Sequence, residues 1–432
     1  MAAGPAQPGH ADPLADGEGD GAVAAGKDPT DDLVARNHRQ LGRDVAVGYM
    51  EVGSAHAAGG DLDQQLARPG PGHRPLDRTQ RRPRLVKLHR PHHGAAYAAG
   101  RAPCHGGGFR YGEKMSLPPL FDRLRLPAIG APLFIVSNPD LVIAQCKAGI
   151  VGAFPALNAR PQALLDEWLH RITEELAAWD RDHPDRPAAP FAVNQIVHRS
   201  NARLQEDMAT CAKWKVPIVI TSLGAIVEVN QAVHGWGGIT LHDIINDKFA
   251  HKAVDKGADG IVAVAAGAGG HAGRLSPFAL VQEIREWFDG PLILSGAIAT
   301  GRAVLAAQAM GADLAYIGSP FIATAEANAA EEYKQGIVAG RADDIVYSSL
   351  FTGVHGNYLR ASIVAAGLDP DKLPEGDIST MDFATGASKS KAWRDIWGSG
   401  QGIGAVREVL PAADYVARLA AEYEAALAGL RA

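Results

Sequence analysis

The feature of this sequence that most restricts its fold is a repeated alternation of short apolar runs and longer helix-like patterns after Met115. Glycines such as Gly149, Gly257 and Gly311 stand where a helix C-cap is needed before the next run. Eight βα units in roughly 220 residues predict an α/β fold, a (β/α)8 TIM barrel. A doubly wound open sheet is the competing fold, although it normally has fewer strands and a glycine fingerprint after its first strand. The expected strands are 128–132, 150–156, 191–197, 217–224, 239–244, 260–266, 291–298 and 314–322, and the clearest helices are 138–148, 160–179, 278–288 and 301–310.

The composition of residues 1–114 differs from that of the rest of the chain. This segment has no isoleucine, no tryptophan and one phenylalanine, Phe109, whereas it holds eight of the sixteen histidines. Burial of so few large apolar groups cannot offset the entropy of ordering a chain of this length. Residues 1–114 are therefore expected to be either a disordered N-terminal extension or an upstream stretch outside the working protein, with the true start at Met115. The barrel is expected at 115–344, followed by a helical cap subdomain and C-terminal helix at 345–432.

Charge and cysteine usage exclude several classes of function. A net charge of -6 gives no electrostatic reason to expect nucleic acid. Cys104, Cys146 and Cys211 are too few and too scattered for a disulfide framework or a metal site, and they fit a reducing, cytoplasmic setting. No apolar run reaches the 18 or so residues of a membrane span. We therefore expect an enzyme that acts on small molecules, without a metal; a homo-oligomer is compatible with the sequence.

The turns after the seventh and eighth expected strands favour a phosphate site. In a (β/α)8 barrel the active site is built at the carboxyl ends of the strands, and a phosphate often binds beside the last two. Gly296 and Ala297 follow the seventh run, and Gly318 and Ser319 follow the eighth. Glycines there let backbone amides approach a dianion closely, although glycines that merely turn the chain are the alternative.

The sharpest single feature is the loop GAGGHAG at 267–273, after the sixth expected strand. Four glycines flank His271, so this histidine is expected to project into the barrel mouth with backbone packed close on both sides. An imidazole there can act as acid, base or hydrogen-bond donor near neutral pH. A solvated loop histidine is the alternative. The role of His242 stays open, whereas the other histidines of the body lie among charged residues and are expected at the surface.

Taken together, these segments resemble the nitronate monooxygenase family, formerly called 2-nitropropane dioxygenases, which are FMN-dependent (β/α)8-barrel enzymes. The resemblance runs from Met115 to the C-terminus. Its segments are LPAIGAPLFIVSNPDLV near the start, AVNQ in the third strand, AGAGGHAG after the sixth, LILSGAIATGRAV at the seventh, GADLAYIGSPFIAT at the eighth and WGSGQGIGAV near the end.

The resemblance implies a role for each matching position. His271 would be the catalytic histidine, and Gln401 to Gly404 would close the site. The flavin ring of FMN would be packed by Ala131, Pro132 and Leu133, would form hydrogen bonds with Asn194 and Gln195, and would lie beside Gly270. The phosphate of FMN would be held by Gly296, Ala297, Gly318 and Ser319. Two positions depart from the family pattern. Leu133 replaces a methionine, and Asp243 falls where some members carry a flavin-contacting lysine, which leaves the preference for an anionic substrate open.

The implied reaction is the oxidation of alkyl nitronates or nitroalkanes with O2 to carbonyl compounds and nitrite. His271 would deprotonate the carbon next to the nitro group, or would hold the nitro or nitronate oxygens by hydrogen bonds. One alternative is an FMN-dependent NAD(P)H reductase of a quinone or enoyl thioester, and another is a flavin-free phosphosugar isomerase or lyase. An inosine-monophosphate dehydrogenase-like reaction needs a nucleophilic cysteine after the sixth strand, whereas Cys146 and Cys211 fall within expected helices.

Overall fold

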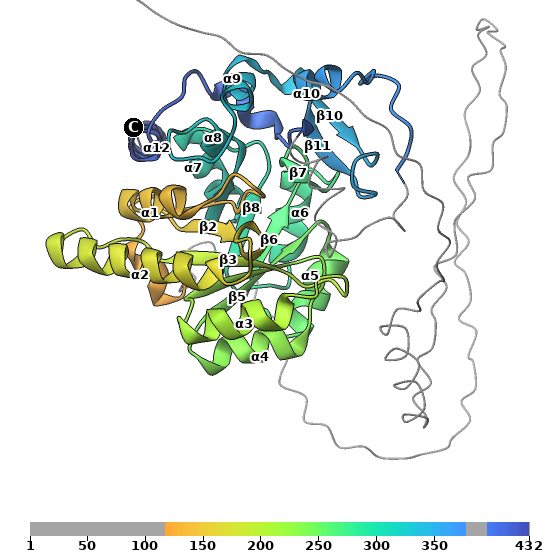
Figure 1. The fold of residues 1–432 in the computed structure, drawn as a ribbon. Coiled ribbons are helices and arrows are strands. Elements are labelled where there is room, and N and C mark those ends of the chain that lie inside the picture. The colour runs from red at the N-terminus through yellow and green to blue at the C-terminus, as the bar shows by residue number, and fades with distance from the viewer. Residues whose placement is uncertain (1–116, 377–394, 432) are drawn as a thin grey trace, which may run out of the picture. The chain divides into compact units, whose positions relative to one another are not determined.

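The computed structural model describes residues 117–376 and 395–431, so the predicted extension at 1–114 lies outside the described residues. Its centre is a sheet of eight parallel strands in the order β1-β9-β8-β6-β5-β4-β3-β2 (Figure 1). The strands of this sheet are β1 (Ala128–Gly130), β2 (Gly152–Pro155), β3 (Phe191–Ile196), β4 (Ile218–Ser222), β5 (Ile239–Ile244), β6 (Gly260–Val264), β8 (Leu292–Ser295) and β9 (Leu314–Ile317).

The sheet closes on itself between β1 and β2. Ile129 forms a parallel bridge with Val151, and the amide of Gly130 donates to the carbonyl of Val151 at 2.8 Å. On the other side of β1, Ala128 pairs with Ala315 of β9. Closure of the ring confirms the barrel and excludes the open sheet.

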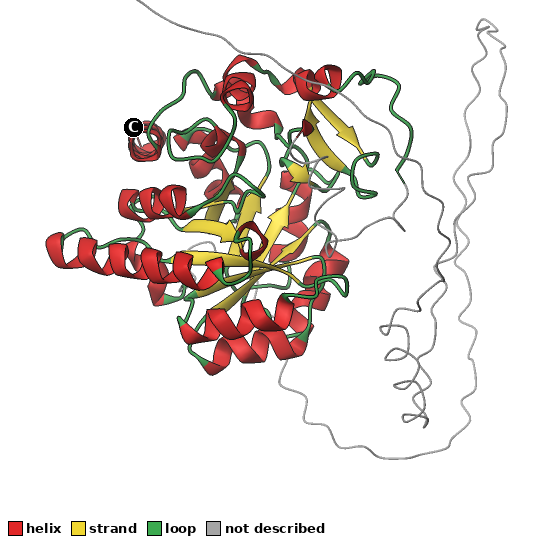
Figure 2. Ribbon diagram, viewed as in Figure 1, coloured by secondary structure: helices red, strands yellow, loops and turns green. Residues whose placement is uncertain are grey.

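Helices surround the strands, as Figure 2 shows. They are α1 (Pro139–Ala148), α2 (Leu164–Asp182), α3 (Leu204–Lys213), α4 (Val227–Gly235), α5 (Asp247–Asp255), α6 (Pro277–Arg285), α7 (Gly301–Met310) and the short α8 (Ser319–Ile322). Local sequence sets their ends. Asn138 and Thr300 accept a hydrogen bond from an amide in the first turns of α1 and α7, and Gly149 and Gly311 end the same two helices in the left-handed conformation, at φ 95° and 112°.

The expected eighth strand, 314–322, is too long. The strand ends at Ile317, and residues Ser319–Ile322 form the single turn of α8. Pro320 explains the difference, because a proline lacks the N–H that a strand needs but fits the first turn of a helix. Phe321 and Ile322 of this turn are buried. A short run of buried apolar residues fits either a strand or a helical turn, so the sequence pattern does not distinguish the two.

The interior of the barrel is filled by apolar side chains. Residues such as Ile129, Ile220 and Val262 form one buried cluster, which also includes Phe121 of the 3-10 helix η1 (Pro119–Arg123). Two further clusters fill the space between the strands and the helices. The barrel is therefore a packed core, and space for a ligand is left beyond the carboxyl ends of the strands.

The segment after α8 adds a small antiparallel sheet to the expected helices. The elements are α9 (Glu331–Ala339), β10 (Ile345–Ser348), β11 (Gly356–Leu359), α10 (Arg360–Ala365) and α12 (Ala412–Arg431), with 3-10 helices η2 (Ala156–Asn158), η3 (Ala342–Asp344) and η5 (Gln401–Ala405) elsewhere. The strand β11 pairs with β10 and with β7 (Gly270–His271) from the loop after β6. In Figure 1 these strands and α10 lie together at one end of the barrel. The tail helix α12 instead packs on α1 and α7, so it belongs to the wall and does not cover the mouth. No helix among the described residues is long and apolar enough to cross a membrane.

The contact between α12 and α7 makes Gly301 sensitive to any side chain. A Cβ at this position would lie 2.0 Å from the carbonyl oxygen of Leu419, and the Gly301 amide donates to Glu422 at 2.8 Å. Gly301→Ala is expected to lower the free energy of unfolding by about 3 kcal/mol, because α12 must shift. Gly429→Ala, near the end of α12 with no atom within 4 Å of its added Cβ, should raise it by up to about 1 kcal/mol, because alanine is the better helix former. Urea unfolding measures both, and equal stabilities would contradict the predicted contact.

Candidate active site

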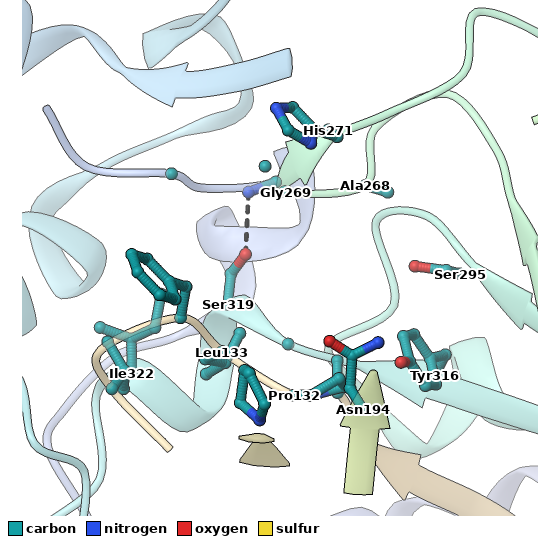
Figure 3. A pocket seen from close by; sticks show the side chains of 18 of the residues that line it. Pro132, Leu133, Asn194, Ala268, Gly269, His271, Ser295, Tyr316, Ser319 and Ile322 are labelled. Atoms are coloured by element: carbon teal, nitrogen blue, oxygen red, sulfur yellow. Dashed lines mark hydrogen bonds between the residues drawn. The ribbon is translucent and has the colours of Figure 1, made fainter. Parts of the chain in front are cut away.

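A cavity of about 390 Å³ lies at the carboxyl ends of the barrel strands (Figure 3). A volume of this size is typical of sites for small molecules and cofactors. Ten of the eleven residues that the sequence predicted for the site line it: Ala131, Pro132, Leu133, Asn194, Gly270, His271, Gly296, Ala297, Gly318 and Ser319. The fold thus gathers residues that are spread over almost 190 positions of the sequence.

Gln195 is the exception, and its predicted contact with flavin is wrong. Its side chain is fully buried on the opposite face of β3, where Nε2 donates to the Sγ of Cys211 on α3 at 3.4 Å. Successive residues of a strand point to opposite faces. Asn194 faces the cavity, so its neighbour Gln195 faces the helices. His242, which the sequence left open, is likewise buried on an outer face, with Nδ1 2.6 Å from the Oγ1 of Thr221.

Glycine-rich segments converge on one side of the cavity. The carbonyl of Gly267, after β6, accepts hydrogen bonds from the amides of Ala297 and Gln401 at 3.3 and 2.9 Å. The Oγ of Ser319, after β9, accepts from the amide of Gly400 at 2.8 Å, drawn as the dashed line in Figure 3. A Cβ at Gly269 would lie 2.8 Å from the nitrogen of Gly400 and 2.9 Å from Ser319 Oγ. Three strand-end loops and the C-terminal segment therefore form a backbone cradle that depends on glycine.

His271 is held in place by the added sheet. It pairs with Gly356 of β11, and its Nε2 lies 2.9 Å from the Oγ1 of Thr352. Thr352 donates its single hydroxyl hydrogen to the carbonyl of Val354 at 2.9 Å, so Nε2 of the imidazole is assigned as the donor to Thr352. Burial lowers the pKa of His271 to about 4. The imidazole is consequently neutral throughout the physiological range.

A chain of hydrogen-bonded polar side chains joins three adjacent strands. Asn194 of β3 donates from Nδ2 to the Oγ of Ser222 at 2.7 Å and to the carbonyl of Ile220 at 3.1 Å. Ser222 of β4 in turn donates to Oδ2 of Asp243 on β5 at 2.5 Å. Burial raises the pKa of Asp243 to about 6, although the hydrogen bond from Ser222 opposes this shift. Burial, with the charge of Asp243, raises the pKa of Tyr316 on β9 as well. In Figure 3, His271 lies well apart from Asn194 and Tyr316.

Sequence reasoning gave no role to five further residues of this site. Ser222 and Tyr316 lie at strand ends, where inward-facing polar residues are expected to take part in ligand binding. Thr352 lies in the aromatic-rich stretch SSLFTGVHGNYLR, and only the pairing of β7 with β11 brings it to His271. Trp397 stacks on Tyr333 with ring centroids 4.9 Å apart, and the hydroxyl of Tyr333 donates to the carbonyl of Gly398 at 2.6 Å. This aromatic pair forms part of the cavity wall.

Residues 127–422 match the family model described as nitronate monooxygenase. The chain belongs to the nitronate monooxygenase family. It is accordingly a flavin-dependent oxidoreductase. The nitronate monooxygenase of Paraburkholderia phytofirmans is 27% identical over 362 residues, which cover 74% of this chain and 97% of that protein.

Two solved structures share the fold. The nitroalkane oxidase from Streptomyces ansochromogenes superposes with a TM-score of 0.60 at 24% identity and covers 72% of this chain and 100% of its own. FabK from Thermotoga maritima gives a TM-score of 0.57 at 21% identity and covers 72% and 96%. At these identities the two structures establish the fold of this chain and not its substrate.

The residues of the cavity fit a flavin nucleotide. The segments 296–297 and 318–319 line the cavity with backbone, which suits a phosphate, and a Cβ at Gly296 would lie 2.8 Å from the carbonyl oxygen of Ala266. Pro132 and Leu133 supply an apolar face. Since both hydrogens of the Asn194 amide are used within the protein, its Oδ1 is left as an acceptor for a ring N–H.

Replacement of Gly269 should weaken flavin binding. The Cβ of Gly269→Ala would push Gly400 and Ser319 out of the cradle, and we expect the dissociation constant of the flavin to rise about tenfold, or 1.4 kcal/mol. Titration of flavin-free protein by flavin fluorescence measures this constant. Gly235→Ala, with no atom within 4 Å of its Cβ, is the matched control. Equal affinities in both variants would show that the cradle does not hold the flavin.

The buried carboxyl of Asp243 should cost stability at high pH. Its pKa of about 6 in the folded state exceeds the ordinary 3.8, so its contribution is fully favourable below pH 3.8 and is lost as the pH rises through 6. Asp243→Asn is expected to stabilise the flavin-free protein by about 2 kcal/mol at pH 8 and by little near pH 4. Urea unfolding at both pH values tests this, and a pH-independent difference would contradict it.

Proposed function

We propose that this protein is an FMN-dependent nitronate monooxygenase that oxidises alkyl nitronates or nitroalkanes with O2 to carbonyl compounds and nitrite. The observation that carries the proposal is that one cavity joins His271, anchored by Thr352, to the glycine cradle of 269–270, 296–297 and 318–319. Membership of the nitronate monooxygenase family supports it. A flavin-free phosphosugar isomerase would leave this family's chemistry unused.

FMN, when bound, supplies the electron transfer from substrate to O2. The phosphate would be held at the cradle, where Gly296, Ala297, Gly318 and Ser319 present backbone close to the cavity. Ala131, Pro132 and Leu133 would pack against the ring, and Asn194 would accept a hydrogen bond from it. The stacked pair of Trp397 and Tyr333 would keep water from the reacting carbon.

His271 would handle the proton of the substrate. Its pKa of about 4 keeps the imidazole neutral at pH 7, so the ring is able to accept a proton from the carbon next to a nitro group. A nitronate has already lost that proton and only accepts hydrogen bonds, so the neutral ring would orient it by turning its Nε2–H from Thr352 to a nitronate oxygen. Thr352 acts as a positioning residue, because its hydrogen bond sets the orientation of the imidazole.

The proposal is tested by anaerobic reduction of the bound flavin with a nitroalkane or its nitronate. Wild-type protein should lose its flavin absorbance near 450 nm, on the order of one flavin per chain, and His271→Ala should be reduced about 100-fold more slowly. His251→Ala, an exposed histidine on α5, is the control. Unchanged reduction in His271→Ala would remove this residue from the mechanism. Rapid bleaching by NADH, with none by nitro compounds, would favour the NAD(P)H-dependent reductase.

The cellular location, the binding partners and the oligomeric state of the protein are also predictions. A cytoplasmic location, small-molecule partners and a homo-oligomer are expected from composition and family. Size-exclusion chromatography with light scattering would determine the oligomeric state.

A further inference from the structure

Asp243 is a half-buried carboxyl group in the cavity that the chemistry of His271 does not use. Its Oδ2 accepts the hydroxyl hydrogen of Ser222, which itself accepts from Asn194. Because these three residues lie on the paired strands β3, β4 and β5, the carboxyl is held by the sheet and not by a loop. Its position in the cavity wall is therefore rigid.

The charge of this carboxyl is not neutralised by a cation. Among the described residues none forms an ion pair with Asp243, and the titratable group that responds to it is Tyr316, which carries no positive charge. The raised pKa of Asp243, about 6, still leaves it ionised at pH 8. A charge in a poorly hydrated site acts strongly on any group that binds nearby.

The other permanently charged residue that lines the described cavity is Arg160, and it does not offset Asp243. Its side chain is exposed, its Nε donates to the carbonyl of Leu157 at 2.8 Å, and its guanidinium lies 5.4 Å from the centre of the Phe134 ring. Solvent screens an exposed charge far more than a buried one. The field in the part of the cavity next to Asp243 is consequently negative.

We propose that Asp243 makes this cavity select neutral ligands over anionic ligands of the same shape. Within the proposed function, on which this inference rests, the preferred substrate is then the neutral nitroalkane and not its nitronate anion. Ser222 and Asn194 are positioning residues, because they hold the carboxyl in the wall. A nitroalkane still carries the proton on the carbon next to the nitro group, so the preference also gives His271 a proton to accept.

Nitrobenzene and benzoate are a suitable pair of probes, because they have nearly the same shape and differ by one negative charge. Their dissociation constants are measured on the flavin-loaded protein at pH 8 from the perturbation of the flavin spectrum, without turnover. Wild-type protein should bind nitrobenzene about tenfold more tightly than benzoate. In Asp243→Asn, benzoate should gain about tenfold, whereas nitrobenzene should change by less than about twofold. A wild-type preference for benzoate, or an unchanged ratio in the variant, would overturn the proposal.

Two further variants separate local from general effects. Asp255→Asn removes one exposed carboxylate from the end of α5 and should leave both constants unchanged. Asp243→Ser offers a smaller uncharged side chain if Asp243→Asn fails to retain flavin, and it should show the same loss of discrimination. Nitroethane and ethyl nitronate are then compared in anaerobic flavin reduction. If neither nitro compound reduces the flavin but nitrobenzene still binds more tightly than benzoate, the proposed function fails and charge selection by Asp243 stands. If both nitro compounds reduce the flavin but the two probes bind equally well, the proposed function stands and charge selection fails.

Discussion

Closure of the eight-stranded sheet between β1 and β2 is the constraint on which the rest of this structure depends. The bridge between Ile129 and Val151 turns an open sheet into a ring, and the ring brings the carboxyl ends of all eight strands to one rim. The loops after β6, β8 and β9 follow neighbouring strands, so they lie side by side at this rim, where Gly267 accepts hydrogen bonds from the amides of Ala297 and Gln401.

Convergence of backbone, more than of side chains, shapes one half of the cavity. The carbonyl of Gly267 accepts hydrogen bonds from two amides, and the hydroxyl oxygen of Ser319 accepts one from a third. Such close approach excludes side chains at Gly269 and Gly400, so that loop conformation and ligand space are two consequences of the same contacts. The C-terminal segment at 398–402 completes the cradle, so the end of the chain and the strand-end loops line one cavity.

Burial acts in opposite directions on the pKa values of His271 and Asp243 in the cavity. It lowers the pKa of His271 to about 4 and raises that of Asp243 to about 6, because desolvation disfavours the charged form of each. The imidazole is thus neutral at every pH at which the carboxyl is mostly ionised. A site with this arrangement presents a neutral imidazole at one place and a negative charge at another, and these two properties are the basis of the proposed preference for a neutral substrate.

Local patterns in the sequence determined the fold and much of the site. The eight apolar runs, the caps at Asn138 and Thr300 and the loop glycines depend on contacts between near neighbours in the chain, so they predict the barrel, the cradle and His271. The error at Gln195 was avoidable, since strand alternation alone places it opposite Asn194. Only the tertiary structure decided that Thr352 anchors His271, that α12 belongs to the wall and that Ser222 joins Asn194 to Asp243. Hydrogen bonds of these three contacts join residues 81, 121, and 28 and 21 positions apart, so no local pattern of the sequence reports them.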